Sequence, residues 1–310
     1  MKIFLLAIAT LFNLNCFSQN YKQTDDYVKS LGSLDSLNIA TITDTLTYKF
    51  AKKEEKARAI FYWVANNISL DLKAAKGNDR KATVLQIIET RKANSLGFSL
   101  LVQEMMSQAN IRCLSVDGYV KTEIDDVPDE PNASWNVVQL GTSPTEWYYV
   151  DAAMAAGYAD KRFTTFTKEF TGEFFFSDRV AFNLIHFPDN TAWLLGPGAK
   201  SVKEFYSQPV IHNAAIIYNL QKISPVKGLI KTRLKDKTDF RLEFISTPVV
   251  SDVSLLVGDA KRSPKAYKME YKTAGNVIEF SFQFKIDSDY PFQILIDGKP
   301  LATYQADVRE

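Results

Sequence analysis

The apolar residues of this chain follow two different periods, and the change between them limits the folds open to it. Between residues 52 and 68 they have the spacing of one buried helix face, at Ala57, Ile60, Phe61, Val64 and Ile68. Beyond about residue 215 they alternate with polar residues, as at Ile278, Phe280, Phe282 and Phe284. Alternation of this kind is typical of a strand with one buried face. The sequence therefore predicts an α+β region followed by an all-β sandwich.

The segments around these two patterns complete the expected organisation. Residues 20–50 favour one or two short helices, and further helices are expected at 82–90 and from Ser95 to Ala109. Strands are expected near 111–122, 134–140 and 146–152, and then at 239–246, 253–257, 267–272, 276–284 and 291–304. The last of these segments contains Asp297-Gly298, which predicts a two-residue hairpin turn. We expect one domain over residues 20–210 and an immunoglobulin-like β-sandwich over 215–310.

Composition and charge exclude several classes of function. The 310 residues are 46% hydrophobic and carry a formal net charge of +1, so no basic field favours nucleic acid. No glycine-rich phosphate loop is present, and no cofactor is expected. The acidic segment 123–132 could hold a cation, but its proline content favours a solvated loop, and no metal site is predicted.

Residues 1–19 have the layout of a signal peptide, with one lysine, an apolar run and then small and polar residues. The run is too short for a comfortable membrane span, so the mature chain is expected in the periplasm, on the cell surface or secreted, without an integral span. Cys16 leaves a lipoprotein as an alternative, although Asn15 before it is not the small residue such sites prefer. After cleavage only Cys113 remains, and we expect it to be a buried, inert thiol.

Ser95 stands at the start of a predicted helix, where free N–H groups and the helix dipole favour negative charge on a nucleophile. The alternative is that Ser95 caps the helix, as serine commonly does. Only two histidines, His186 and His212, could act as its base. His186 lies in a His-Phe-Pro segment that predicts a structural turn with Phe187 buried, and we expect neither histidine to reach Ser95.

Four segments in a fixed order resemble the transglutaminase-like superfamily, which has the papain-like cysteine protease fold. They are "EKARAIFYWVANNIS", "RKANSLGFSLLVQEMMSQANIRCLSVDGYVK", "ASWNVVQL" and "EWYYVDAAMAAG". A fifth, "FFFSDRVAFNLIHFPDNTAWLLGP", is similar to a segment of the kyphoscoliosis-peptidase branch. The resemblance implies an α+β core of that fold.

The resemblance also implies where a catalytic triad would lie. In the family a Cys thiolate forms an acyl-enzyme, a His transfers the proton and an Asp orients the His. These three positions fall on Ser95, Ala133 and Asp151, so the Cys and the His are replaced. A binding groove would be lined by Asn94, Trp135 and Asn136.

The sequence therefore predicts an exported, catalytically inactive transglutaminase-like protein that binds a peptide or an envelope protein. Two alternatives stay open. One is an active acyltransferase or peptidase-type hydrolase that uses Ser95, and the other is a purely structural envelope protein whose groove is filled by its own side chains.

Overall fold

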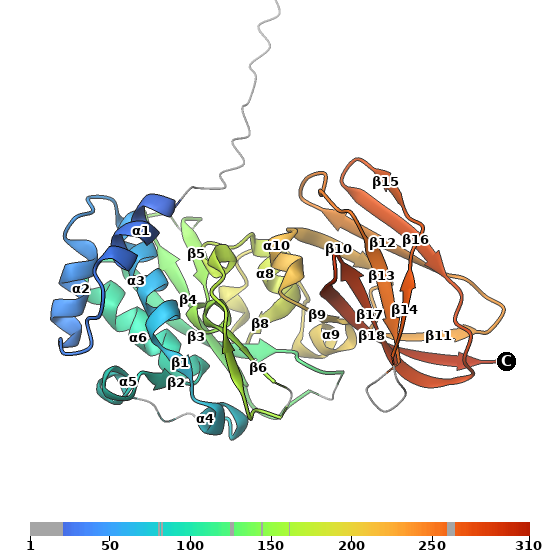
Figure 1. The fold of residues 1–310 in the computed structure, drawn as a ribbon, viewed down its shortest axis with the longest axis horizontal. Helices are drawn as coiled ribbons and strands as arrows, with labels where there is room; N and C mark the ends of the chain where they lie inside the picture. The colour runs from blue at the N-terminus through green and yellow to red at the C-terminus, as the bar shows by residue number, and fades with distance from the viewer. Residues whose placement is uncertain are drawn as a thin grey trace, which may run out of the picture.

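The computed structural model describes residues 21–310, except residues 80, 82, 125–126, 144, 161 and 259–263. The expected signal peptide and Cys16 lie outside the described residues. Figure 1 shows an N-terminal α+β part followed by a β part, as the two hydrophobic periods predict.

Helices cover one side of the α+β part. They are α1 (Lys22–Ser30), α2 (Ile39–Thr47), α3 (Lys53–Asn67), α4 (Leu72–Lys76), α5 (Val84–Thr90) and α6 (Ser95–Gln108). Helix α3 contacts α1, α2 and α6, because its apolar face, including Ile60, Phe61 and Val64, is fully buried. The helices predicted at 52–68, 82–90 and 95–109 are confirmed within a few residues at each end.

The central sheet of this part is antiparallel and has the order β5-β4-β3-β8. Its strands are β3 (Arg112–Val120), β4 (Ala133–Gln139), β5 (Trp147–Val150) and β8 (His186–Pro188). Helix α6 packs on β3 and β4, and α8 (Arg179–Ile185) contacts β5 and β8. Neighbouring side chains of a strand point to opposite faces. Asn136 bonds to α6, whereas Trp135 packs on Phe182 of α8, so the two helices cover opposite faces.

Short elements connect this sheet to the rest of the chain. Strands β1 (Ser69–Leu70) and β2 (Lys92–Ala93) pair in parallel, and β6 (Gly157–Ala159) and β7 (Phe166–Lys168) form an antiparallel pair. The remaining elements are α7 (Ala152–Ala156), η1 (Gly172–Phe174), η2 (Thr191–Trp193), α9 (Val202–Ser207), β9 (Val210–Ile211) and α10 (Ala214–Ile217).

The C-terminal part consists of two facing sheets. One has the order β10 (Leu220–Ser224), β12 (Thr238–Phe244), β16 (Val277–Phe282), β15 (Lys272–Ala274). The other has the order β11 (Leu229–Arg233), β18 (Lys299–Arg309), β17 (Ser288–Ile296), β13 (Val253–Val257), β14 (Lys265–Lys268). The rings of Phe240, Phe292 and Tyr304 pack between the sheets. Strand β9 also pairs with β18, which ties the sandwich to the α+β part.

Two local predictions in the sandwich have different outcomes. The turn at Asp297-Gly298 is confirmed, with φ of 49° and 76°, and it joins β17 to β18. The single strand predicted at 267–272 is wrong, because the chain leaves β14 after Lys268 and enters β15 of the other sheet at Lys272. Tyr267, Met269 and Tyr271 all pack against the core, so the alternating pattern continues through the crossing.

In the part of the chain that the structure describes, no helix combines the length and the apolar character needed to cross a membrane.

Candidate functional site

Ser95 is the first residue of α6, and its hydroxyl bonds to the neighbouring strand. The Oγ atom accepts a hydrogen bond from the Ser134 N–H of β4 at 3.2 Å. The N-cap is the residue before it, since the Asn94 Oδ1 accepts from the Gly97 N–H at 3.0 Å. The expectation that Ser95 caps the helix is therefore wrong. Its side chain instead joins the helix start to the sheet.

Ala133 is the first residue of β4 and pairs with Gly118 of β3. Its side chain is a buried methyl group, which can neither accept nor donate a proton. The position at which the resemblance would place a general base therefore has no acid–base function in this chain.

Asp151 directly follows β5 and is 3% exposed. Its Oδ1 accepts from the Met154 N–H at 2.8 Å and so caps α7. Its Oδ2 lies 3.0 Å from the Nε2 of His186. Both carboxylate oxygens therefore have a partner within the fold.

His186 also lies at this site, beside Asp151, although the sequence did not predict it there. Its side chain is fully buried, and it begins β8 rather than a turn, although Phe187 is buried as expected. The ring Nε2 faces Asp151, and the Nδ1 lies 3.2 Å from the Phe182 carbonyl oxygen. Both ring nitrogens thus face acceptors other than Ser95. A signal was present in the sequence, because an aspartate at the end of a predicted strand needs a hydrogen-bonding partner if it is buried, and the chain has only two histidines.

A stack of three rings fixes His186 in place. The His186 and Phe182 rings are parallel within 6° at 3.8 Å, and Phe182 stacks on Tyr149 at 4.1 Å. Trp135 meets both Phe182 and His186 edge-on. The Tyr149 hydroxyl donates to the Trp193 carbonyl oxygen, and burial raises the pKa of this phenol to about 12. His186 is thus part of the core beneath β4 and β5.

The three residues predicted to line a groove do not lie on an open surface. Asn94, Trp135 and Asn136 are 8%, 1% and 1% exposed. Asn94 caps α6, Trp135 packs under the sheet, and the Asn136 Nδ2 donates to the Ser99 carbonyl oxygen at 2.9 Å. As the structure places them, these side chains hold the helix and the sheet together.

The remaining candidate residues lie away from this site or are buried. The Nε2 of His212 lies 2.7 Å from the Thr303 Oγ1, at the junction with the sandwich. Cys113 is buried as expected, and burial raises the pKa of its thiol. Among the described residues, which leave out Asp125 and Asp126 of the acidic loop, no three His, Cys, Asp or Glu side chains are grouped so as to hold a metal ion.

In the described structure, the hydrogen bonds of Ser95 and His186 are made to other parts of the fold and not to each other. The partner of the Ser95 hydroxyl in the described structure is a donor, and a serine nucleophile needs an acceptor for its proton. Histidine and aspartate are still adjacent, but their hydrogen bonds are made to the fold.

Comparison with known proteins agrees with this fold. The family model described as the transglutaminase-like superfamily matches residues 40–152. Human kyphoscoliosis peptidase is 26% identical over 231 residues, which are 72% of this chain and 34% of that protein. The mouse protein of the same name is 29% identical over 185 residues, covering 57% of this chain and 27% of that protein. The Lim and transglutaminase domain protein ltd-1 of Caenorhabditis elegans is 22% identical over 67% of this chain and 31% of its own length.

The chain thus spans about a third of the length of these curated relatives. The crystal structure of a TGase matches 52% of this chain and 37% of its own at 16% identity, with a TM-score of 0.28. The family match covers α2 to β5, together with Ser95, Ala133 and Asp151. Residues 40–152 therefore form a transglutaminase-like domain, and the chain is similar to the kyphoscoliosis peptidases.

Proposed function

We propose that this chain is a non-catalytic transglutaminase-like protein that binds a peptide or protein in the cell envelope. The observation that carries the proposal is the placement of His186. Its Nε2 faces Asp151 and its Nδ1 faces the Phe182 carbonyl oxygen, so neither nitrogen is directed at Ser95.

The magnitude of the loss supports inactivity. Removal of one member of a catalytic triad typically lowers the rate by about 10⁴-fold to 10⁶-fold. Here the nucleophile is a serine in place of a thiolate, and the histidine position holds the methyl group of Ala133. Asp151 cannot replace the base, because its two oxygens accept from Met154 and lie against His186.

A peptide is the ligand class that the relatives suggest. Two of them are named peptidases, and an enzyme of that kind must hold an extended chain before it cuts one. Ser95 and Leu96 at the start of α6 are half-buried, so this end of the helix still reaches the surface. A fold that has lost its nucleophile can retain a recognition surface at this place.

The burial of the expected groove favours a second candidate, a purely structural envelope protein. Asn94, Trp135 and Asn136 fill the region between helix and sheet. If the start of α6 binds nothing, the fold serves as a rigid spacer. The two candidates agree on inactivity and differ on binding.

Inactivity is tested by labelling and by restoration. The wild-type protein is treated with a fluorophosphonate probe, which forms a stable adduct with activated serines, and adducts are located by mass spectrometry. We expect no adduct at Ser95. The double variant Ser95→Cys/Ala133→His is then compared with Ser95→Cys and with Ser107→Cys, an exposed position on the same helix. We expect alkylation by iodoacetamide at neutral pH to be faster in the double variant than in either control. A Ser95 adduct in the wild type, absent in Ser95→Ala, would establish the enzyme alternative.

Binding is tested at the exposed end of α6. A fluorescent glutamine-containing peptide is titrated onto the wild type, Leu96→Glu and Leu85→Glu, the last being a 68% exposed leucine on α5. We expect binding to the wild type and to Leu85→Glu, and loss in Leu96→Glu. Absence of binding to the wild type, or equal binding by all three, would favour the structural candidate.

Export is the final part of the proposal. The layout of residues 1–19 supports cleavage near Ser18–Gln19. The mass of the protein recovered from the producing cells tests it. A chain that begins near residue 20 is expected, whereas a lipidated Cys16 would establish the anchored alternative and an intact Met1 would contradict export.

A further inference from the structure

The strand β11 forms one edge of the larger sheet in the sandwich. Among the described residues its one strand partner is β18, with which it pairs in parallel from Leu229 opposite Gln305 to Arg233 opposite Arg309. An edge strand presents a row of backbone donors and acceptors that can pair with another extended chain. The question is which chain would suit this edge.

The hydrogen bonds at both ends of β11 show which backbone groups point outward. The Gly228 carbonyl oxygen accepts from the Gln305 N–H, and the Leu234 N–H donates to the Arg309 carbonyl oxygen. In a parallel ladder the residues that bond to a given neighbour alternate along the strand. Residues 228, 230, 232 and 234 therefore face β18, and the backbone groups of Leu229 and Lys231 face away from it.

The segment that contains β11 is strongly basic. Residues 227–237 read KGLIKTRLKDK, with five cations against the single carboxylate of Asp236. The cations are Lys227, Lys231, Arg233, Lys235 and Lys237, and none has an ion-pair partner among the residues that the structure describes. The chain as a whole has a formal charge of only +1, so this concentration is local.

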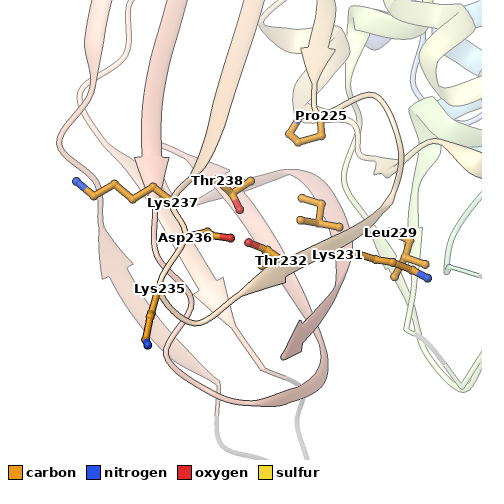
Figure 2. A pocket seen from close by; sticks show the side chains of 9 residues that line it. Pro225, Leu229, Lys231, Thr232, Lys235, Asp236, Lys237 and Thr238 are labelled. Carbon is orange, nitrogen blue, oxygen red and sulfur yellow. The ribbon is translucent and has the colours of Figure 1, made fainter. Parts of the chain in front are cut away.

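A hollow of about 730 Å³ lies beside the strand, between β11 and the segment that leads into β12. Figure 2 shows Pro225 at one end and the side chains of Lys235 and Lys237 extending outward from the rim. Two apolar side chains near the start of the basic segment are exposed, Val226 just before it at 51% and Leu229 within it at 47%. The surface thus combines outward backbone groups, an apolar contact and a cationic rim.

We propose that the edge of β11 binds an extended acidic segment of a partner protein, which adds a strand beside Leu229–Arg233. Lysines on an edge strand repel a second copy of the same edge and so oppose self-association. The same cations attract a strand with alternating carboxylates, whose backbone pairs with Leu229 and Lys231 while its acidic side chains meet Lys231, Arg233 and Lys235. This surface is separate from the Ser95 site and requires no catalytic activity.

The probe is a fluorescein-labelled peptide of alternating glutamate and valine, about eight residues long, roughly the length of a strand. Its fluorescence anisotropy is measured with the whole protein. Lys231→Glu/Lys235→Glu tests the charge. Lys231→Pro tests strand pairing, because it removes an outward N–H and leaves the ladder to β18 intact. Lys265→Glu and Lys265→Pro are the matched controls on β14, the opposite edge of the same sheet.

We expect both β11 variants to weaken binding by about tenfold or more, and the β14 controls to change it less than about twofold. Circular dichroism melts show whether each variant is still folded, and the control peptide of alternating lysine and valine should not bind. If the Glu-Val peptide does not bind the wild type, or if Lys231→Pro binds it as tightly as the wild type does, strand addition at β11 is overturned. A DNA oligonucleotide is the control for charge alone. If it binds the wild type and Lys231→Pro equally and binds Lys231→Glu/Lys235→Glu more weakly, the surface is an unspecific cationic one, and strand addition at β11 is again overturned.

Discussion

The substitution His186→Phe tests whether the His186–Asp151 pair stabilises the fold. Phenylalanine keeps a ring in the stack on Phe182, where the ring centroids are 3.8 Å apart. It removes the partner of the Asp151 Oδ2, and Asp151 is 3% exposed. Breaking a buried pair by removing one member costs about 3–5 kcal/mol, because the remaining charge is left uncompensated. We expect a loss near the lower end, about 3 kcal/mol, since the Met154 N–H still donates to this carboxylate.

Tryptophan fluorescence during urea denaturation measures this loss in the appropriate part of the chain. The four tryptophans, at 63, 135, 147 and 193, all precede the sandwich, so their signal follows the α+β part. Asp151→Asn and the double variant His186→Phe/Asp151→Asn complete a thermodynamic cycle, and we expect a coupling of about 1–3 kcal/mol. Tyr48→Phe, at a ring that is 69% exposed, is the control and should change the free energy of unfolding by less than about 0.5 kcal/mol. A loss below about 1 kcal/mol for His186→Phe, or single effects that simply add, would refute the reasoning.

Three further predictions follow from other contacts. Gly118→Ala should destabilise the protein by about 3 kcal/mol or more in the same denaturation assay. The reason is that a Cβ at this position would lie 2.4 Å from the Phe187 carbonyl oxygen and 2.4 Å from the Trp135 ring. An unchanged free energy of unfolding would mean that the sheet can shift to make room for the methyl group. Burial alone would raise the pKa of Asp297, but hydrogen bonds from neighbouring groups, including the Tyr218 hydroxyl, lower it to about 2. The carboxylate therefore stabilises the fold above pH 4, about its ordinary pKa, and this contribution is lost as the pH falls through about 2. Asp297→Asn should be less stable than the wild type at neutral pH, with a difference that closes in acid melts followed by circular dichroism, and a pH-independent difference would contradict the assignment. Cys113 should resist iodoacetamide in the native protein and react after denaturation, as peptide mass spectrometry would show; rapid native labelling would contradict its burial.

The periodic parts of the chain could be predicted from the sequence because local pattern and tertiary packing agree there. The helix at Lys53–Asn67 buries the apolar face that its spacing defines, and the turn at Asp297-Gly298 has the positive φ values that its residues favour. The strand predicted at 267–272 failed for a physical reason. Tyr267, Met269 and Tyr271 keep alternating contact with the core while the chain passes from one sheet to the other. Alternation of apolar and polar residues indicates which side chains are buried. It does not indicate which strand is the hydrogen-bonding neighbour.

The candidate site could be predicted only in part, since its decisive contact is not local. Ser95, Ala133 and Asp151 were identified by position in a family pattern, whereas His186 lies 35 residues beyond Asp151 in a region of short, mixed elements. No periodicity in residues 160–210 indicates that the His-Phe-Pro segment forms β8 at the edge of the central sheet. The contact of the Ser95 side chain is also non-local and could not be predicted. Serine at a helix start predicts an N-cap, but Asn94 is the N-cap here, and the Ser95 hydroxyl accepts a hydrogen bond from β4.

Asp151, the position at which the resemblance places the triad aspartate, has a structural role in this fold. One oxygen caps α7 and the other pairs with a buried histidine, so replacing the carboxylate would leave a helix N-terminus without its cap and His186 without its partner. Ala133 and Ser95 have smaller structural roles. The methyl group of Ala133 is buried, and the Ser95 hydroxyl accepts one hydrogen bond from the Ser134 N–H. An aspartate at this position is therefore weak support for residual catalysis. His186 is the more informative residue. A catalytic histidine would direct one ring nitrogen at the nucleophile, whereas the two nitrogens of His186 face Asp151 and the Phe182 carbonyl oxygen.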